Sequence, residues 1–160
     1  MAYRRDGIGG WHPATVIATW FGVGLLPKAP GTWGSAAALP LGWWIMTQGG
    51  APLLLAAVLV CSIVGWWASA VYVARTGAPD PSEVVVDEVA GQWLVLSAAP
   101  LDPLSFAVGF ALFRLFDIWK PWPVRLADQK IGGGLGVMLD DIAAGLYGLL
   151  GMAAWRQVWS

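Results

Sequence analysis

The longest run without an ionisable side chain extends from Ala29 to Ala74, where 46 consecutive residues include no Asp, Glu, Lys, Arg or His. A single helix of that length would measure about 69 Å, more than twice the ~30 Å hydrocarbon core of a bilayer. The run must therefore fold back on itself, and the Gly- and Pro-containing stretch Thr47–Pro52 is the expected turn. This predicts one membrane segment near Thr32–Thr47 and a second near Pro52–Ala74. The first segment is short for a full crossing and is interrupted by Pro40.

The composition of the whole chain supports a membrane protein. Of its 160 residues, 58% are hydrophobic, only 12% are charged and 12 are tryptophan. Soluble domains carry about 25% charged residues, and tryptophan favours the membrane–water interface. The net charge of −1 gives no basic surface for nucleic acid. We expect a single membrane domain over residues 1–160, with its core at about 14–159.

Three further apolar segments follow, at about Val84–Ala99, Leu104–Trp119 and Leu139–Trp159. The polar, Gly- and Pro-rich stretch Lys120–Val137 is interpreted as a long loop, and Val16–Leu26 as a segment lying on the membrane surface. The predicted fold is therefore an all-α, polytopic bundle with about four to five spans and an N-terminal interfacial segment.

The distribution of basic residues orients these spans. With the N-terminus in the cytoplasm, the inside segments hold seven basic residues. The outside segments hold one, Arg156 near the C-terminus. This asymmetry agrees with the positive-inside rule. The inside residues are Arg4, Arg5, Lys28, Arg75, Lys120, Arg125 and Lys130.

The same orientation gathers six carboxylates at the cytoplasmic face, namely Asp87, Glu88, Asp117, Asp128, Asp140 and Asp141. Ionisable groups near membrane depth are costly and tend to serve function. Each of the pairs Asp87-Glu88 and Asp140-Asp141 is followed within one helical turn by a glycine, Gly91 or Gly145, which would let another helix approach closely. Acids that only stabilise helix N-termini are the simpler interpretation, but one acid per helix would suffice for that.

Basic residues near these acids suggest a phosphate site. Arg114, Asp117 and Lys120 have helical spacing and share one face, although an ion-paired helix end would look the same. Thr32 is a candidate N-cap of a helix that begins after Lys28, and free backbone N–H groups at such a start suit a phosphate. Crowded carboxylates call for a hard cation such as Mg²⁺. Metal-assisted hydrolysis of a lipid phosphoester at the cytoplasmic face follows as the predicted chemistry.

Nucleophilic schemes fit the sequence less well. Cys61 is the only cysteine and lies in the middle of an apolar run, where a small core residue is expected. His12 is the only histidine, so a mechanism that needs two histidines is excluded.

Four runs of the chain resemble the phosphatidylglycerophosphatase A family of bacterial membrane lipid phosphatases. They are Phe21–Ser35, Val86–Gly91, Phe113–Pro123 and Gly132–Gly145. The resemblance implies an all-helical fold and Mg²⁺-dependent removal of the terminal phosphate of phosphatidylglycerophosphate, giving phosphatidylglycerol, in the bacterial cytoplasmic (inner) membrane.

The polar positions that match the family's motifs are assigned roles as follows. Metal ligands or the general base are expected among Asp87, Glu88, Asp140 and Asp141. Lys28, Thr32, Arg114 and Lys120 are expected to bind the phosphate, with Asp117 orienting the two basic residues beside it. Asp128 is a further possible site residue.

Three alternatives stay open from the sequence. The substrate could be another lipid phosphomonoester such as phosphatidate, because no residue pattern reads the head group. A small transporter that uses intramembrane carboxylates and a purely structural membrane protein are the other two.

Overall fold

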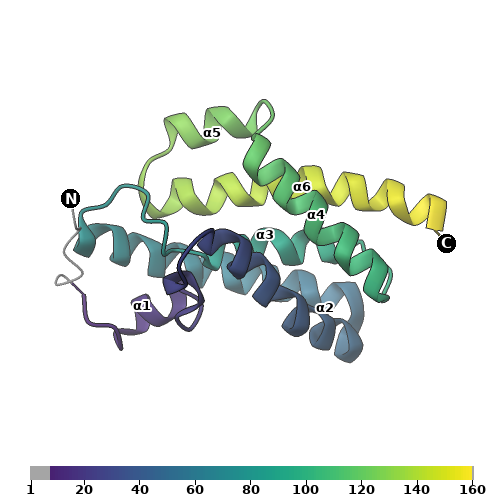
Figure 1. Cartoon of the computed structure of the whole chain (residues 1–160), viewed down its shortest axis with the longest axis horizontal. Helices are drawn as coiled ribbons and strands as arrows, with labels where there is room; N and C mark the ends of the chain where they lie inside the picture. The colour runs from purple at the N-terminus through teal and green to yellow at the C-terminus, as the bar shows by residue number, and fades with distance from the viewer. Residues whose placement is uncertain (1–7, 160) are drawn as a thin grey trace.

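The computed structural model describes residues 8–159, except for the side chains of residues 127 and 128, and this part of the chain is helical without a strand. The all-α class predicted from the sequence is confirmed. Figure 1 shows the elements, which are α1 (Pro13–Ala18), the 3-10 turn η2 (Val23–Leu25), α2 (Pro30–Thr76), α3 (Val86–Leu96), α4 (Pro103–Trp119), α5 (Val124–Lys130) and α6 (Gly133–Trp159).

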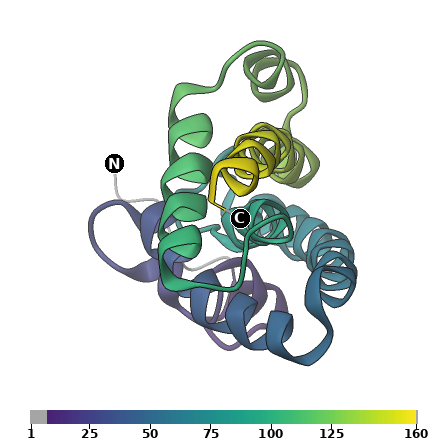
Figure 2. The ribbon, with the colours of Figure 1, turned by 90° about the vertical axis from the view of Figure 1, so that its right-hand side faces the viewer.

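The helix α2 is a hairpin of two helical arms. Gly50 has φ 63° and ψ −160°, a backbone conformation that is almost restricted to glycine, and Pro52 follows it. The chain reverses at this point (Figures 1 and 2). The reversal lies within the predicted turn Thr47–Pro52.

The helix α3 lies at the centre of the fold. Ten of its eleven residues are buried, and it packs mainly against α2 and α6. A Cβ atom added to Gly145 of α6 would lie 2.9 Å from the carbonyl oxygen of Gly91, so the two helices cross at these glycines. The close approach expected at Gly91 and Gly145 is confirmed. The helix itself is shorter than the predicted segment Val84–Ala99.

The prediction of a long loop over Lys120–Val137 is wrong. Lys120 does end α4, as predicted, because the following proline disfavours a helical conformation there; Lys120 itself is left-handed, with φ 49°. The short helix α5 then begins at Val124, and α6 begins at Gly133. The last helix is therefore six residues longer at its start than the predicted segment Leu139–Trp159.

Large apolar side chains cover much of the outer surface. Leu59 of α2, Ile118 of α4 and Leu150 of α6 are each more than 60% exposed, and contiguous apolar surface of this kind marks a membrane or a protein partner. Two of the described helices, α2 and α6, are long and apolar enough to cross a membrane.

Candidate functional site

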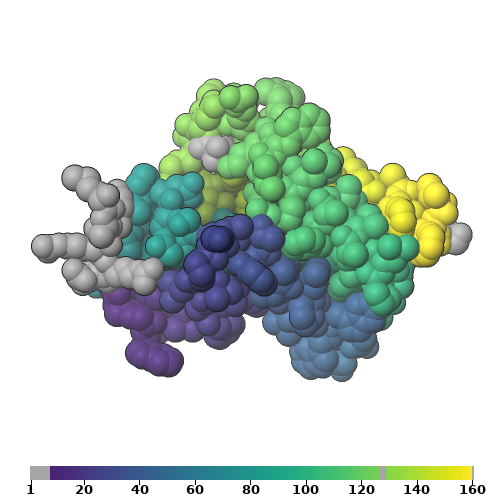
Figure 3. All heavy atoms as spheres, viewed as in Figure 1, coloured from purple at the N-terminus to yellow at the C-terminus, as the bar shows by residue number. Residues whose placement is uncertain are grey.

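A pocket of about 460 Å³ opens at one end of the bundle. Its walls come from the beginning of α2, the segment 77–85 between α2 and α3, the beginning of α3, the end of α4 and the beginning of α6. In Figure 3 the surface is hollowed between the dark blue start of α2, the teal atoms on its left and the green atoms above it. Because the segment 77–85 runs directly into α3, four separate regions of the sequence meet at this cavity.

Five of the predicted acids converge on this pocket. Asp87 and Glu88 of α3 and Asp141 of α6 can bring one carboxylate oxygen each within 4.8 Å of one another. Asp117 of α4, Asp140 and Asp141 form a second group that meets the same criterion. Asp141 belongs to both groups, so the two lie side by side.

Local structure explains why these acids meet. The backbone N–H of Val85 donates a hydrogen bond to the carbonyl oxygen of Ala18 at 2.8 Å, and α3 begins at the next residue. Asp87 and Glu88 therefore occupy the first turn of α3. The absence of a side chain at Gly91 lets α6 approach until the Asp141 carbonyl would lie 2.7 Å from an added Cβ.

Several carboxylate oxygens in the pocket have no protein partner. Asp87 and Asp141 are only 6% and 3% exposed. Asp87 Oδ1, Glu88 Oε2 and Asp141 Oδ2 are buried without a hydrogen-bond partner among the residues that the structure describes. Buried carboxylates that are close together repel one another when ionised, and an unpaired buried charge is costly. The arrangement suits a divalent cation, which takes oxygen ligands.

Two cations stand beside the acids. Arg114 forms an ion pair with Asp117 three residues later on α4. Lys120, at the end of α4, places its Nζ 2.6 Å from Oδ2 of Asp140 on α6. Both cations line the pocket, and such side chains are common ligands of phosphate oxygens.

A sequence model of the family described as Phosphatidylglycerophosphatase A matches residues 16–156. This match covers most of the chain and all of the pocket. The chain belongs to the phosphatidylglycerophosphatase A family.

Two of three similar proteins carry the same name as the family. Phosphatidylglycerophosphatase A of Escherichia coli is 39% identical over 137 residues, which are 85% of this chain and 77% of the relative. The Haemophilus influenzae protein of the same name is 38% identical over 140 residues, 87% of this chain and 86% of the relative. A Bacteroides thetaiotaomicron protein, provisionally named a phosphatidylinositol-3-phosphatase, is 40% identical over 150 residues, 89% and 93% of the two chains. No solved structure matches the chain significantly.

In this phosphatidylglycerophosphatase A family member, two of the predicted residues that the structure describes, Lys28 and Thr32, do not line the pocket. Lys28 is exposed, whereas its neighbours Ala29, Pro30 and Gly31 line the cavity. Thr32 is half-buried, and the prediction that it caps the helix is wrong. The helix begins at Pro30, and its N-cap residue is Ala29, which has no side-chain acceptor to cap it; proline suits the first helical position because it has no N–H there. The side chain of Asp128 lies outside the described residues.

The segment between α2 and α3 was not predicted to belong to the site. Pro79, Asp80, Pro81 and Ser82 all line the pocket. The alternation of two prolines with an acid and a hydroxyl was a possible signal, because prolines stiffen a loop. No motif in this loop, however, indicates a contact with the other motifs, so its place at the site could not be predicted.

Proposed function

We propose that this chain hydrolyses the terminal phosphate monoester of phosphatidylglycerophosphate and releases phosphatidylglycerol and inorganic phosphate. Membership of the phosphatidylglycerophosphatase A family supports this substrate. The observation that carries the proposal is the convergence of five acids and two basic residues, from α3, α4 and α6, on one pocket.

The donor set fits Mg²⁺. Asp87, Glu88 and Asp141 offer oxygens close enough to share one ion, and each has a buried oxygen without a partner among the described residues. Asp140, in the second group, is the fourth ligand candidate. When bound, Mg²⁺ activates a water molecule and neutralises charge on the phosphoryl oxygens.

The other residues of the pocket have roles that follow from their charges. Arg114 and Lys120 bind the phosphoryl oxygens, and their carboxylate partners Asp117 and Asp140 hold them in position. A carboxylate of the cluster that does not ligate metal accepts the proton of the attacking water. Lys28, exposed beside the pocket wall, attracts the anionic head group from the membrane surface.

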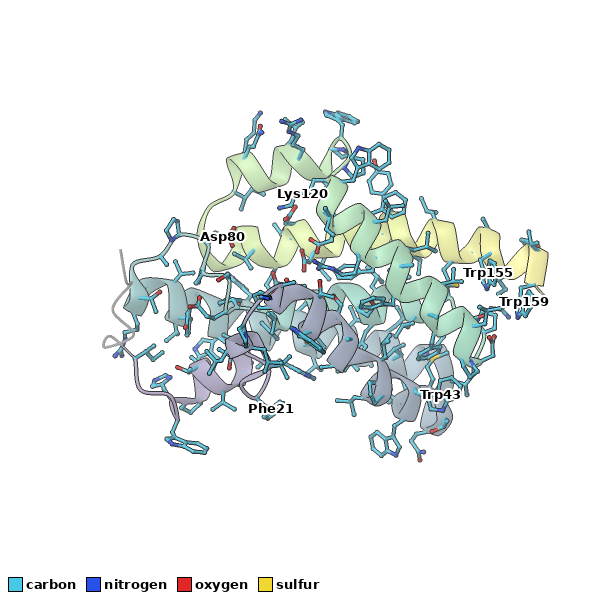
Figure 4. All side chains as sticks on the ribbon, viewed as in Figure 1. Phe21, Trp43, Asp80, Lys120, Trp155 and Trp159 are labelled. Carbon is cyan, nitrogen blue, oxygen red and sulfur yellow. The ribbon has the colours of Figure 1, made fainter. Side chains whose placement is uncertain are left out.

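We further propose a multi-pass arrangement in the bacterial cytoplasmic (inner) membrane, with the N-terminus and the pocket at the cytoplasmic side. The crossings are α4, α6 and each of the two arms of α2, and α3 is a fifth, short one. Its 11 residues rise only about 17 Å, but its burial shields it from lipid. In Figure 4, Trp43, Trp155 and Trp159 lie toward the end of the molecule away from Asp80, which fits an aromatic belt at the membrane–water interface on that side.

The test is phosphate release by the purified protein in mixed micelles, with phosphatidylglycerophosphate, phosphatidylinositol 3-phosphate and phosphatidate compared at matched acyl chains. We expect the highest kcat/KM for phosphatidylglycerophosphate, and loss of activity after chelation with recovery on adding Mg²⁺. Equal turnover of all three lipids would contradict the narrow assignment. Ion flux through vesicles without phosphate release would favour a transporter.

A further inference from the structure

Asp80 and Ser82 stand apart from the other polar residues of the pocket. The other five acids of its wall lie on α3, α4 and α6, and all are at least partly buried, whereas Asp80 and Ser82 belong to the segment 77–85 and are exposed. Figure 4 shows Asp80 on this segment and Lys120 at the end of α4, so the two lie on different walls of the same cavity. Asp80 and Ser82 are therefore placed at the opening, away from its acidic floor.

The segment that carries them is held firmly. Pro79 and Pro81 fix their own backbone and restrict Asp80 between them to an extended conformation, and Pro81 is buried. The N–H of Val84 donates to the carbonyl oxygen of Pro81 at 3.0 Å.

A second contact fixes the same segment from the other side. The carbonyl oxygen of Glu83 packs so closely on η2 that a Cβ added to Gly24 would lie 1.9 Å from it. A ligand that meets Asp80 therefore meets a side chain on an ordered backbone, and binding does not have to order the loop.

The chemistry of Asp80 decides what it can bind. Its carboxylate makes no hydrogen bond or ion pair with any residue that the structure describes. An ionised carboxylate accepts hydrogen bonds but donates none, and it repels a phosphate. The natural partner is a neutral group with O–H donors, and the hydroxyl of Ser82 can both donate and accept beside it.

We propose that Asp80 and Ser82 bind the hydroxyl-bearing glycerol that links the two phosphates of the lipid head group, and so select this substrate. The inference rests on the proposed function. With the terminal phosphate bound by Arg114 and Lys120, the linking glycerol, joined to it through the ester oxygen, would extend toward the opening. In phosphatidate that place is taken by the esterified glycerol, which offers Asp80 no O–H donor.

The experiment measures kcat/KM of the purified full chain for phosphatidylglycerophosphate and phosphatidate in mixed micelles with Mg²⁺. The variants are Asp80→Ala, Asp80→Asn and Ser82→Ala. Glu83→Gln is the matched control, because it removes an adjacent carboxylate that does not line the pocket. As a second measurement, inhibition by phosphatidylglycerol reports on a ligand that keeps the linking glycerol but has lost the terminal phosphate.

We expect Asp80→Ala to lower kcat/KM for phosphatidylglycerophosphate roughly tenfold, the loss typical of one hydrogen bond to a charged group, with phosphatidate turnover unchanged. Asp80→Asn and Ser82→Ala should show smaller losses in the same direction, and inhibition by phosphatidylglycerol should weaken in parallel. The control should behave as wild type.

An equal loss on both lipids, or no change on either together with unchanged inhibition, would overturn the inference while leaving the proposed function standing. A wild-type protein that releases phosphate from neither lipid would contradict the proposed function, and the inference with it.

Discussion

The carboxylates at the two ends of the bundle differ in their burial and in their hydrogen bonding. At the end away from the pocket, Asp102 caps α4. Its Oδ1 accepts the backbone N–H of Ser105 at 2.8 Å, and its Oδ2 accepts the Ser105 hydroxyl at 2.6 Å. The indole N–H of Trp155 in turn donates to the Ser105 oxygen at 3.1 Å. At the pocket end, Asp87 and Asp141 are more deeply buried, and yet each keeps an oxygen without a hydrogen-bond partner in the part of the chain that the structure describes.

The difference lies in the hydrogen bonds of the carboxylates: Asp102 has protein donors for both of its oxygens, whereas Asp87 and Asp141 each keep a buried oxygen without a donor among the described residues. Hydrogen bonds from Ser105 hold the pKa of Asp102 below its usual value, so this carboxylate stabilises the fold by itself. Asp87 and Asp141 lack such hydrogen bonds at their buried oxygens, and further carboxylates lie close to both. A divalent cation bound among them, as proposed above, would offset their mutual repulsion.

The largest effect is expected from Asp141→Asn, which removes one charge from the acids of the pocket. Asp141 belongs to both acid groups, so we expect phosphate release to fall about a hundredfold, within the range for loss of a key acid–base or ligand group. Thermal stability of the metal-free protein should stay unchanged or rise, because one of several buried like charges is removed. Mn²⁺ binding, measured by titration, should weaken as well. Asp102→Asn is the matched control, and activity within twofold of wild type in Asp141→Asn would contradict the site.

A second substitution tests whether the helix crossing holds the acids together. Alanine at Gly91 would place its Cβ 2.5 Å from Phe113 and 2.7 Å from the carbonyl oxygen of Asp141, so α3 and α6 must separate. We expect a loss of about 1–3 kcal/mol in the free energy of unfolding, measured by denaturation in detergent, with a parallel loss of activity. Gly132→Ala meets no atom within 4 Å and should leave stability nearly unchanged. Equal stability of the two variants would show that the crossing tolerates a side chain.

The smallest effect is expected at the opposite end. Asp102→Ala removes the cap of α4 and should lower the melting temperature slightly, with no change in phosphate release. Because the pKa of Asp102 is lower in the folded protein, its stabilisation is present above the unfolded pKa of about 3.9 and is lost as the pH falls through the folded value. The difference in melting temperature between wild type and variant should therefore shrink below about pH 4. A difference that stays constant to pH 3 would contradict the role of the ionised carboxylate.

Patterns local in sequence were predictable. The reversal at Gly50 follows from two glycines and a proline inside an uncharged run, and the end of α4 at Lys120 follows from Pro121. The glycines Gly91 and Gly145, each within one turn of an acid pair, indicated a close helix crossing and thereby part of the site.

Features that depend on packing were not predictable. The glycines at the beginning of α6 have low helix propensity and suggested a loop. In the structure a Cβ at Gly134 would lie 2.3 Å from the backbone nitrogen of Ala70, so contact with α2 requires glycine within this helix. The segment 77–85 likewise depends on contacts with α1, through the hydrogen bond from Val85 to Ala18, and with η2, where the carbonyl of Glu83 packs on Gly24. No motif in the segment indicates these contacts.

The enclosure of α3 has a consequence for how such a protein can adapt. Because its neighbours surround it, the exposed apolar side chains of α2, α4 and α6 can change without touching α3 or the acids that it carries. If the proposed membrane arrangement holds, the protein can then adapt to a thicker or thinner bilayer by substitutions on its outer surface alone.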